Sequence, residues 1–185
     1  MIRAFAAIPL PEAVTDVLDI VQEDLPAGRP VLSEDMHLTL VFLGDLREPD
    51  LEEVHLAFEA IRAGCFSLQI VGLGHFGGSA PRVVYAAVAE NAPLRRLQSK
   101  LQQAARNTGV DLPSRRFVPH VTLARLKGRR EDADVVSRFV ATRSLIAPPP
   151  FAVGSFCLYR SVLRRDGPHY DLLADYKLLP SDASG

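Results

Sequence analysis

The sequence predicts an α+β fold on three observations. Stretches with strand-like and helix-like spacing of apolar residues alternate along the chain, and one strand–helix–strand unit occurs twice. The composition is that of a globular protein, since 48% of the 185 residues are hydrophobic and 23% are charged. These values exclude intrinsic disorder. At this length one domain is expected, and its core needs no disulfide or metal for stability.

The first half of the chain predicts three strands and two helices. Strands are assigned where apolar residues alternate or run together, and helices where they recur every three or four residues. In chain order we expect a buried strand from Ile2 to Ile8, a helix that Pro11 opens, a strand from Met36 to Leu43 that Gly44 ends, a helix from Asp50 to Ala63 and a strand containing Phe66, Leu68 and Ile70.

The second half predicts two more helices and a C-terminal hairpin. In chain order we expect a strand from Arg82 to Ala89, a helix that Asn91 caps and Gly109 ends, a strand from Val118 to Leu126, a helix from Glu131 to Ala141 with Val135, Val136, Phe139 and Val140 inward, and two strands, Phe151 to Leu163 and His169 to Leu178, joined by a turn at 165–168. The last residues, 181–185, are small and polar, and we expect a disordered tail.

The repeated unit organises the whole chain. Residues 2–44 begin with Ile-Arg-Ala-Phe-Ala-Ala-Ile and lead to His37-Leu-Thr-Leu, and residues 82–126 begin with Arg-Val-Val-Tyr-Ala-Ala-Val and lead to His120-Val-Thr-Leu. We therefore expect residues 1–180 to form one domain with an internal duplication. Duplicated units of this kind commonly pack about a pseudo-twofold axis, which would bring the two histidines together across a shared groove.

Each unit carries a histidine and a threonine two positions apart on a predicted strand. Side chains of a strand alternate between its faces, so His37 and Thr39 share one face, as do His120 and Thr122. Two imidazoles near neutral pH can act as base and acid together, and hydroxyls can hold phosphate oxygens. A phosphodiester fits this set best. Two alternatives remain open here: a metal site, or hydrogen-bonded histidines on half-exposed strands without a catalytic role.

Charge and cysteine content narrow the possible classes further. The net charge of −1 and the pI of about 6.5 mean that any contact with nucleic acid must come from a local patch. Two cysteines cannot form a disulfide framework or a thiolate zinc site. The apolar run near the N-terminus is too short for a signal-peptide core or a membrane span, so we expect a cytoplasmic protein.

At these motifs the sequence resembles the 2H phosphoesterase superfamily, whose members carry two His-X-Thr/Ser-X motifs. Within it, the chain is similar to the RNA 2′,3′-cyclic phosphodiesterases, also called 2′-5′ RNA ligases. The likeness covers nearly the whole chain and includes Arg3–Ile8, His37–Gly44, Gly74–Phe76, Pro81–Tyr85, Pro119–Arg125, Leu158–Ser161 and Gly167–Tyr170. Relatives often carry Trp at the position of Tyr85, a change that keeps an aromatic ring.

The resemblance implies a bilobal fold of two pseudo-symmetric lobes, each with an antiparallel sheet and flanking helices, and an active-site groove between them. It implies hydrolysis of RNA 2′,3′-cyclic phosphates to 2′-phosphomonoesters without a metal or cofactor. His120 would be the proton acceptor and His37 the proton donor, and Thr39 and Thr122 would bind the non-bridging oxygens. The partners would be RNA ends or nucleotides with a 2′,3′-cyclic phosphate, and a monomer is expected. The alternatives are a 2′-5′ ligase joining RNA ends such as tRNA halves, and a non-catalytic RNA-end binding protein.

Residues near the motifs are harder to assign. The resemblance makes Arg125 a phosphate or RNA ligand, yet strict alternation places it on the face opposite Thr122, so this role requires a bulge or a strand end. Tyr170 is expected to line the groove, and Phe42, on the face of Leu40, is expected in the core. Arg115 and Arg116 lie in a loop that could meet an RNA backbone. No catalytic role is assigned to the three other histidines, of which the first is expected at the surface: His55, His75 and His169.

Overall fold

The computed structural model describes residues 1–114, 116–145, 148–164 and 167–180. Within them the chain forms four α-helices: α1 (Glu12–Gln22), α2 (Glu48–Glu59), α3 (Ala92–Asn107) and α4 (Ala133–Arg143). The strands are β1 (Ile2–Pro9), β2 (Arg29–Pro30), β3 (His37–Leu46), β4 (Phe66–Leu68), β5 (Ile70–Phe76), β6 (Val83–Val88), β7 (His120–Arg125), β8 (Phe151–Val153), β9 (Ser155–Arg164) and β10 (Gly167–Lys177). Residues 165 and 166 of the expected turn and the expected tail at 181–185 lie outside the described residues.

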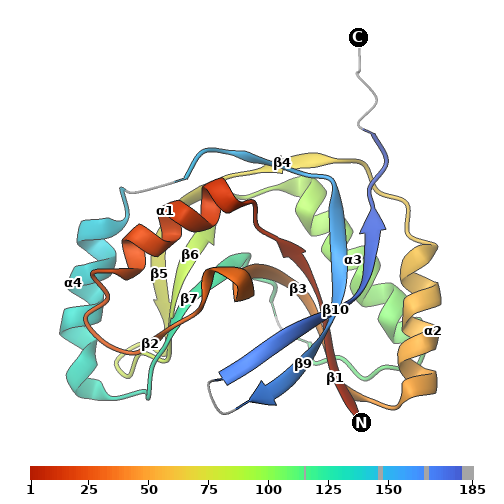
Figure 1. Ribbon diagram of the computed structural model, residues 1–185, viewed down its shortest axis with the longest axis horizontal. Coiled ribbons are helices and arrows are strands. Elements are labelled where there is room, and N and C mark those ends of the chain that lie inside the picture. The colour runs from red at the N-terminus through yellow and green to blue at the C-terminus, as the bar shows by residue number, and fades with distance from the viewer. Residues whose placement is uncertain (115, 146–147, 165–166, 181–185) are drawn as a thin grey trace.

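Most strands belong to one antiparallel sheet, in the order β10-β9-β1-β3-β7-β6-β5, with β2 added beside β7. The strands that carry the histidines, β3 and β7, are therefore central neighbours, and each is followed outward by the first strand of its own unit (Figure 1). The expected lobes do not have separate sheets, because Leu38 of β3 pairs with Val121 of β7 and joins the two halves. Beyond this single pair β3 and β7 diverge, and β2 pairs with the far end of β7.

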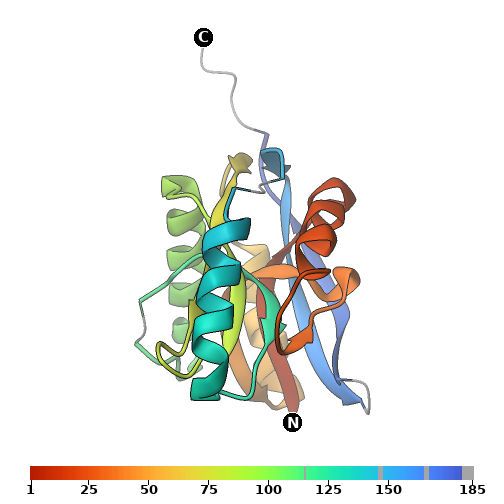
Figure 2. The ribbon, with the colours of Figure 1, turned by 90° about the vertical axis from the view of Figure 1, so that its left-hand side faces the viewer.

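The helices of the two units cross over to the partner unit. The α3 helix packs against β3, and α1 packs against β7, where Gln22 Nε2 of α1 donates to the Leu123 carbonyl oxygen at 2.7 Å. The α4 helix covers β5, and Figure 2 shows it facing the viewer with α3 on one side and α1 on the other. This crossing means that neither half can bury its histidine strand without a helix from the other.

The sequence pattern of α3 is confirmed in detail. The Asn91 side chain accepts a hydrogen bond from the Leu94 backbone N–H at 2.9 Å, which satisfies one of the free donors of the first turn. The apolar side chains at helical spacing are all buried: Leu94, Leu97, Leu101 and Ala105. None of the helices in the described part of the chain combines the length and apolar character that a membrane span requires.

Gly44 does not end the histidine strand, which continues to Leu46. Ala4 pairs with Gly44 and Phe5 with Phe42, so one residue of β3 has no partner on β1 at this point. Gly44 has a φ of +77°, a left-handed conformation that suits glycine in such a bulge. The glycine therefore marks a bulge within the strand, and the sequence interpretation of it as a stop was wrong.

Three other predicted boundaries and one predicted helix face were also wrong. The second helix ends at Glu59, so Ile61 lies beyond it, and Val135 of α4 is exposed instead of inward. The strand predicted around Phe66 is two strands, β4 and β5, and the strand predicted from Phe151 is β8 and β9. In both cases the short strand leaves the main sheet, since β4 and β8 pair with each other. Continuous apolar runs do not reveal such a change of sheet.

Candidate active site

The two histidines and two threonines of the motifs lie on one face of the central strand pair. Leu38 and Val121, the residues that join β3 and β7, are fully buried on the other face. In an antiparallel pair with this register, His37 is beside Thr122 and Thr39 is beside His120. All four of these side chains are half-buried. The structure thus brings together, diagonally arranged, the four residues that the sequence singled out.

A matching β-bulge follows each motif and changes which residues face this site. Ala6 pairs with Val41 and Ala7 with Thr39, so the leucine that follows the first motif is the extra residue. The partners of β7 skip the equivalent Leu123, because Val84 pairs with Ala124 and Tyr85 with Thr122. Each bulge reverses the alternation beyond it.

The bulges place Phe42 and Arg125, at equivalent positions of the two units, on the histidine face. The expectation that Phe42 lies in the core was wrong, since 57% of its surface is exposed. For Arg125 the structure supplies the bulge that a role in the site requires, and its positive charge acts on both histidines. Strict alternation predicts the opposite face for Arg125.

Each histidine ring is fixed by a hydrogen bond to the backbone two residues earlier. The Nδ1 atom of His37 lies 2.7 Å from the Asp35 carbonyl oxygen, and that of His120 lies 2.8 Å from the Val118 carbonyl oxygen. A carbonyl can only accept, so Nδ1 carries the proton in both rings. The neutral rings therefore keep an unprotonated Nε2 for chemistry.

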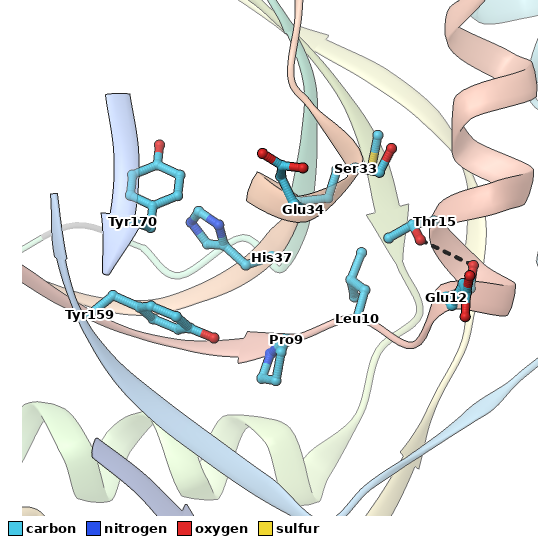
Figure 3. Close-up of a pocket in the computed structure, with 10 residues that line it drawn as sticks. Pro9, Leu10, Glu12, Thr15, Ser33, Glu34, His37, Tyr159 and Tyr170 are labelled. Atoms are coloured by element: carbon cyan, nitrogen blue, oxygen red, sulfur yellow. Dashed lines mark hydrogen bonds between the residues drawn. The ribbon is translucent and has the colours of Figure 1, made fainter. Parts of the chain in front are cut away.

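Aromatic rings hold both imidazoles in place. The Phe5 ring stacks on His37 with centroids 4.8 Å apart, and Tyr170 meets the edge of His37 at 4.9 Å (Figure 3). On the other side, Tyr85 lies 5.4 Å and Phe76 lies 5.0 Å from His120. The position of Tyr170 agrees with its expected place at the site.

Phe5 and Tyr85 are equivalent residues of the repeat. Our sequence analysis did not single out either of them as part of the site. The signal was available, because both precede the Ala-Ala pair of their unit and both lie within the strand that flanks a histidine strand. An aromatic residue at the same place in two copies of a unit indicates a shared role beside the two histidines.

Burial lowers the pKa of both histidines. Desolvation lowers the pKa of His37 to about 4, opposed by the hydrogen bond to Asp35 and aided by the charges of Arg125 and His120. Desolvation also lowers the pKa of His120, and Arg125 adds to the effect. Both rings are consequently neutral at pH 7 when the site holds no anion.

Two pockets flank the histidines and differ in character. The smaller, of about 260 Å³, lies beside His37 under the start of α1, and Glu12, Ser33, Tyr159 and Tyr170 are among its lining residues (Figure 3). The larger, of about 600 Å³, lies beside His120 and Thr39. Its aromatic and polar lining is made by Phe42, Phe76, Phe117, Gln98, Gln102 and Arg116. Arg116 is thus next to the site, whereas Arg115 lies outside the described residues.

The three remaining histidines lie apart from the motif pair or have other contacts. His55 is partly exposed on α2, and it has partners there: its Nδ1 is 2.8 Å from the Tyr176 hydroxyl and its Nε2 is 3.6 Å from Glu59. His75 lies on β5 with a buried Nδ1 that has no hydrogen-bond partner, and His169 lies beside Arg125 in a neighbouring pocket. Among the described residues, no group of three or more His, Cys, Asp or Glu side chains is placed to hold a metal ion.

Comparison with known proteins gives consistent matches. The family model described as the 2′-5′ RNA ligase superfamily matches residues 13–165. The RNA 2′,3′-cyclic phosphodiesterase of Aeropyrum pernix is 33% identical over 83% of this chain and 88% of its own length. That of Geobacillus stearothermophilus is also 33% identical over 95% of this chain, which spans only 57% of that longer protein.

A solved structure agrees with the sequence relatives. The crystal structure of Escherichia coli LigT complexed with 3′-AMP superposes with a TM-score of 0.80 at 28% identity, covering 96% of this chain and 98% of LigT. The family model covers both histidine motifs and more than half of the residues. On these matches, the chain belongs to the 2′-5′ RNA ligase superfamily.

Proposed function

We propose that this protein is an RNA 2′,3′-cyclic phosphodiesterase that yields 2′-phosphomonoesters. The observation that carries the proposal is the pair of imidazoles on one face of β3 and β7, each with Nδ1–H bonded to a carbonyl and Nε2 left for proton transfer. The named activities of the Aeropyrum and Geobacillus relatives support the same reaction. The 3′-AMP bound to LigT supports a nucleotide as ligand.

The geometry supports a two-histidine acid–base mechanism. His120 Nε2 takes a proton from a water molecule as its oxygen attacks phosphorus, and His37 Nε2 gives a proton to the departing 3′ oxygen. The P–O3′ bond breaks and the phosphate stays on the 2′ oxygen. Thr39 and Thr122 donate hydrogen bonds to the non-bridging oxygens. The choice of His37 as donor follows the family resemblance, because the two rings are near-equivalent in their hydrogen bonding.

His37 must be protonated to act as the acid, and its low pKa in the empty site opposes this. A phosphodiester between the histidines supplies a negative charge that favours the imidazolium. We expect His37 to titrate near pH 4 in the free protein and at a higher pH with 2′-AMP bound. The binding of 2′-AMP should therefore raise the fraction of His37 that carries a proton at a given pH. Side-chain NMR of the histidine nitrogens measures both states, and a His37 pKa near 6.5 without ligand would contradict this account.

The reaction is expected to proceed without a metal. Adenosine 2′,3′-cyclic phosphate incubated with the protein in excess EDTA should be converted to 2′-AMP at the rate seen without EDTA. The residues around the histidines supply no carboxylate or thiolate set for a metal, within the part of the chain described. Chromatography that resolves 2′-AMP from 3′-AMP checks rate and product together. Activity lost in EDTA and restored by one divalent metal would overturn the mechanism.

The larger pocket supports a place for the terminal nucleobase. Phe42, Phe76 and Phe117 present aromatic rings beside His120, and Gln98 and Gln102 add amide groups that can meet the polar edge of a base. Stacking on such rings accepts any base, because every base has a π face. A base bound there would belong to the same nucleotide as a phosphate held between the histidines.

A further inference from the structure

A line of positive side chains leads away from the histidines on the side opposite the aromatic pocket. Two pockets, of about 450 and 430 Å³, both include Arg29 and Arg125 in their lining, so they adjoin each other, and we call the two together the depression along β2 and the end of β7. The first also contains Tyr170, which touches His37, so the depression begins at the catalytic face. Its four arginine and lysine residues, together with Arg82, which lies against Gly128 in the loop after β7, are called the basic ridge: Arg29, Arg82, Arg125, Lys127 and Arg129.

The fold presents these cations in fixed places. Arg29 reaches across to the C-terminal hairpin, where a Cβ on Gly167 would lie 3.1 Å from its Nη2 atom. Arg82 lies against the loop after β7, since a Cβ on Gly128 would lie 3.2 Å from its Cζ atom. Glycine at both positions leaves room for the guanidinium groups.

Among the residues that the structure describes, one member of the ridge forms an ion pair with a carboxylate. Arg129 pairs with Glu131 at 3.0 Å. Within the described ranges, no carboxylate forms an ion pair with the other four members of the ridge: Arg29, Arg82, Arg125 and Lys127. Asp35 and Asp132 are the acidic residues that line the two pockets, against four cations there. A chain with a net charge of −1 thus concentrates positive charge at one place beside its catalytic face.

The two flanks of the site therefore differ in chemistry. The larger pocket has three phenylalanine rings and one cation, Arg116, whereas the basic ridge has five cations. A 3′-terminal ribonucleotide with a 2′,3′-cyclic phosphate has two other substituents, the base and the 5′-linked RNA chain. Aromatic rings suit the base, and the cations of arginine and lysine suit the phosphates of the chain.

From this asymmetry we infer the orientation of the substrate: the RNA chain 5′ to the cyclic phosphate runs along the basic ridge, and the preferred substrate is an oligonucleotide. The inference rests on the proposed function and adds to it the substrate length and direction. Each backbone phosphate held on the ridge adds affinity that a mononucleotide cannot gain. The added affinity depends on salt, because each contact releases counterions.

The test compares two substrates with the same reactive end: cytidine 2′,3′-cyclic phosphate and a hexanucleotide that ends in it. We expect Arg29→Ala and Lys127→Ala each to lower kcat/KM for the hexanucleotide by about two- to tenfold, the value of one hydrogen bond. Each should also reduce the slope of log kcat/KM against log salt by about 0.7. Neither should change kcat/KM for the mononucleotide. The matched pair Arg96→Ala and Lys100→Ala, in a pocket that shares no residue with the ridge, should leave both substrates unaffected.

The outcomes separate this inference from the proposed function. The inference fails, while the proposed hydrolysis stands, if the ridge variants lower kcat/KM equally for both substrates. The same holds if they lower kcat/KM for the hexanucleotide no more than the control pair does. If Phe42→Ala removes the preference for the hexanucleotide and the ridge variants do not, the chain runs in the opposite direction. If the wild type hydrolyses neither substrate, the proposed function fails. Fluorescence anisotropy with a hexanucleotide that ends in a 2′-phosphate then still tests the ridge, whose variants must weaken binding.

Discussion

His37→Ala and His120→Ala should each lower kcat for adenosine 2′,3′-cyclic phosphate by about 10²- to 10⁴-fold, the usual contribution of a positioned acid or base. Each substitution removes one partner of a proton transfer that the mechanism requires. Initial rates resolved by chromatography measure the effect. A rate within a few-fold of the wild type for either variant would exclude the two-histidine mechanism.

The double variant is expected to be little slower than either single variant, because residues that act as one unit are not additive. Thr39→Ala and Thr122→Ala remove one neutral hydrogen bond each and should cost less than the histidines. His55→Ala is the matched control, since it makes the same substitution away from the site. It should keep full activity while losing the bond to Tyr176, and with it about 0.5–1.5 kcal/mol of stability.

Stability measurements show whether a histidine variant loses activity because it loses the catalytic group or because it unfolds. Leu38 is fully buried beneath the histidine face, so Leu38→Ala should lower the free energy of unfolding by about 2–5 kcal/mol. The histidine variants should lose less stability than Leu38→Ala, since each removes one backbone hydrogen bond and the ring contacts of a half-buried side chain and leaves no cavity in the core. If His37→Ala instead unfolded the protein more than Leu38→Ala, the assignment of faces would be inverted.

The sequence singles out the residues of the candidate site because duplication acts as an internal comparison. A single His-X-Thr is a weak signal, but its recurrence in a second copy of the unit identifies all four residues, which β3 and β7 then place side by side. The strand order in the sheet also repeats between the two units, since β1 lies beside β3 and β6 lies beside β7. We propose that this arrangement reflects an internal duplication within one domain.

The failures of sequence prediction share a physical cause. Alternation identifies faces only while a strand stays regular, and a bulge adds one residue and exchanges the faces beyond it. The only trace of each bulge is a pair of adjacent apolar residues, Leu40-Val41 and Leu123-Ala124, and such pairs also occur in regular buried strands. The exposure of Phe42 was missed for this reason, whereas for Arg125 the sequence analysis gave a bulge or a strand end as the condition for a role in the site, and the structure has the bulge.

Arg125 faces the histidines only because of the bulge at Leu123. Removal of the Arg125 side chain should have the second largest effect on activity. Arg125→Ala should lower kcat/KM for the mononucleotide by about 10- to 100-fold, because a hydrogen bond to a charged group contributes about 1.5–3 kcal/mol. Arg125→Lys should recover part of the rate, since it restores the charge without the planar fork of the guanidinium. The matched control, Arg96→Ala, should leave the rate unchanged.

The same substitution should change the histidines even without substrate. The charge of Arg125 lowers the pKa of His37 and of His120, so Arg125→Ala should raise both pKa values, whereas Arg125→Lys should leave them near those of the wild type. Side-chain NMR of the histidines reads this directly. A guanidinium that served only to stabilise the end of β7 would leave both pKa values unchanged on removal. The kinetic loss together with a rise in both pKa values would therefore place Arg125 at the histidine pair itself.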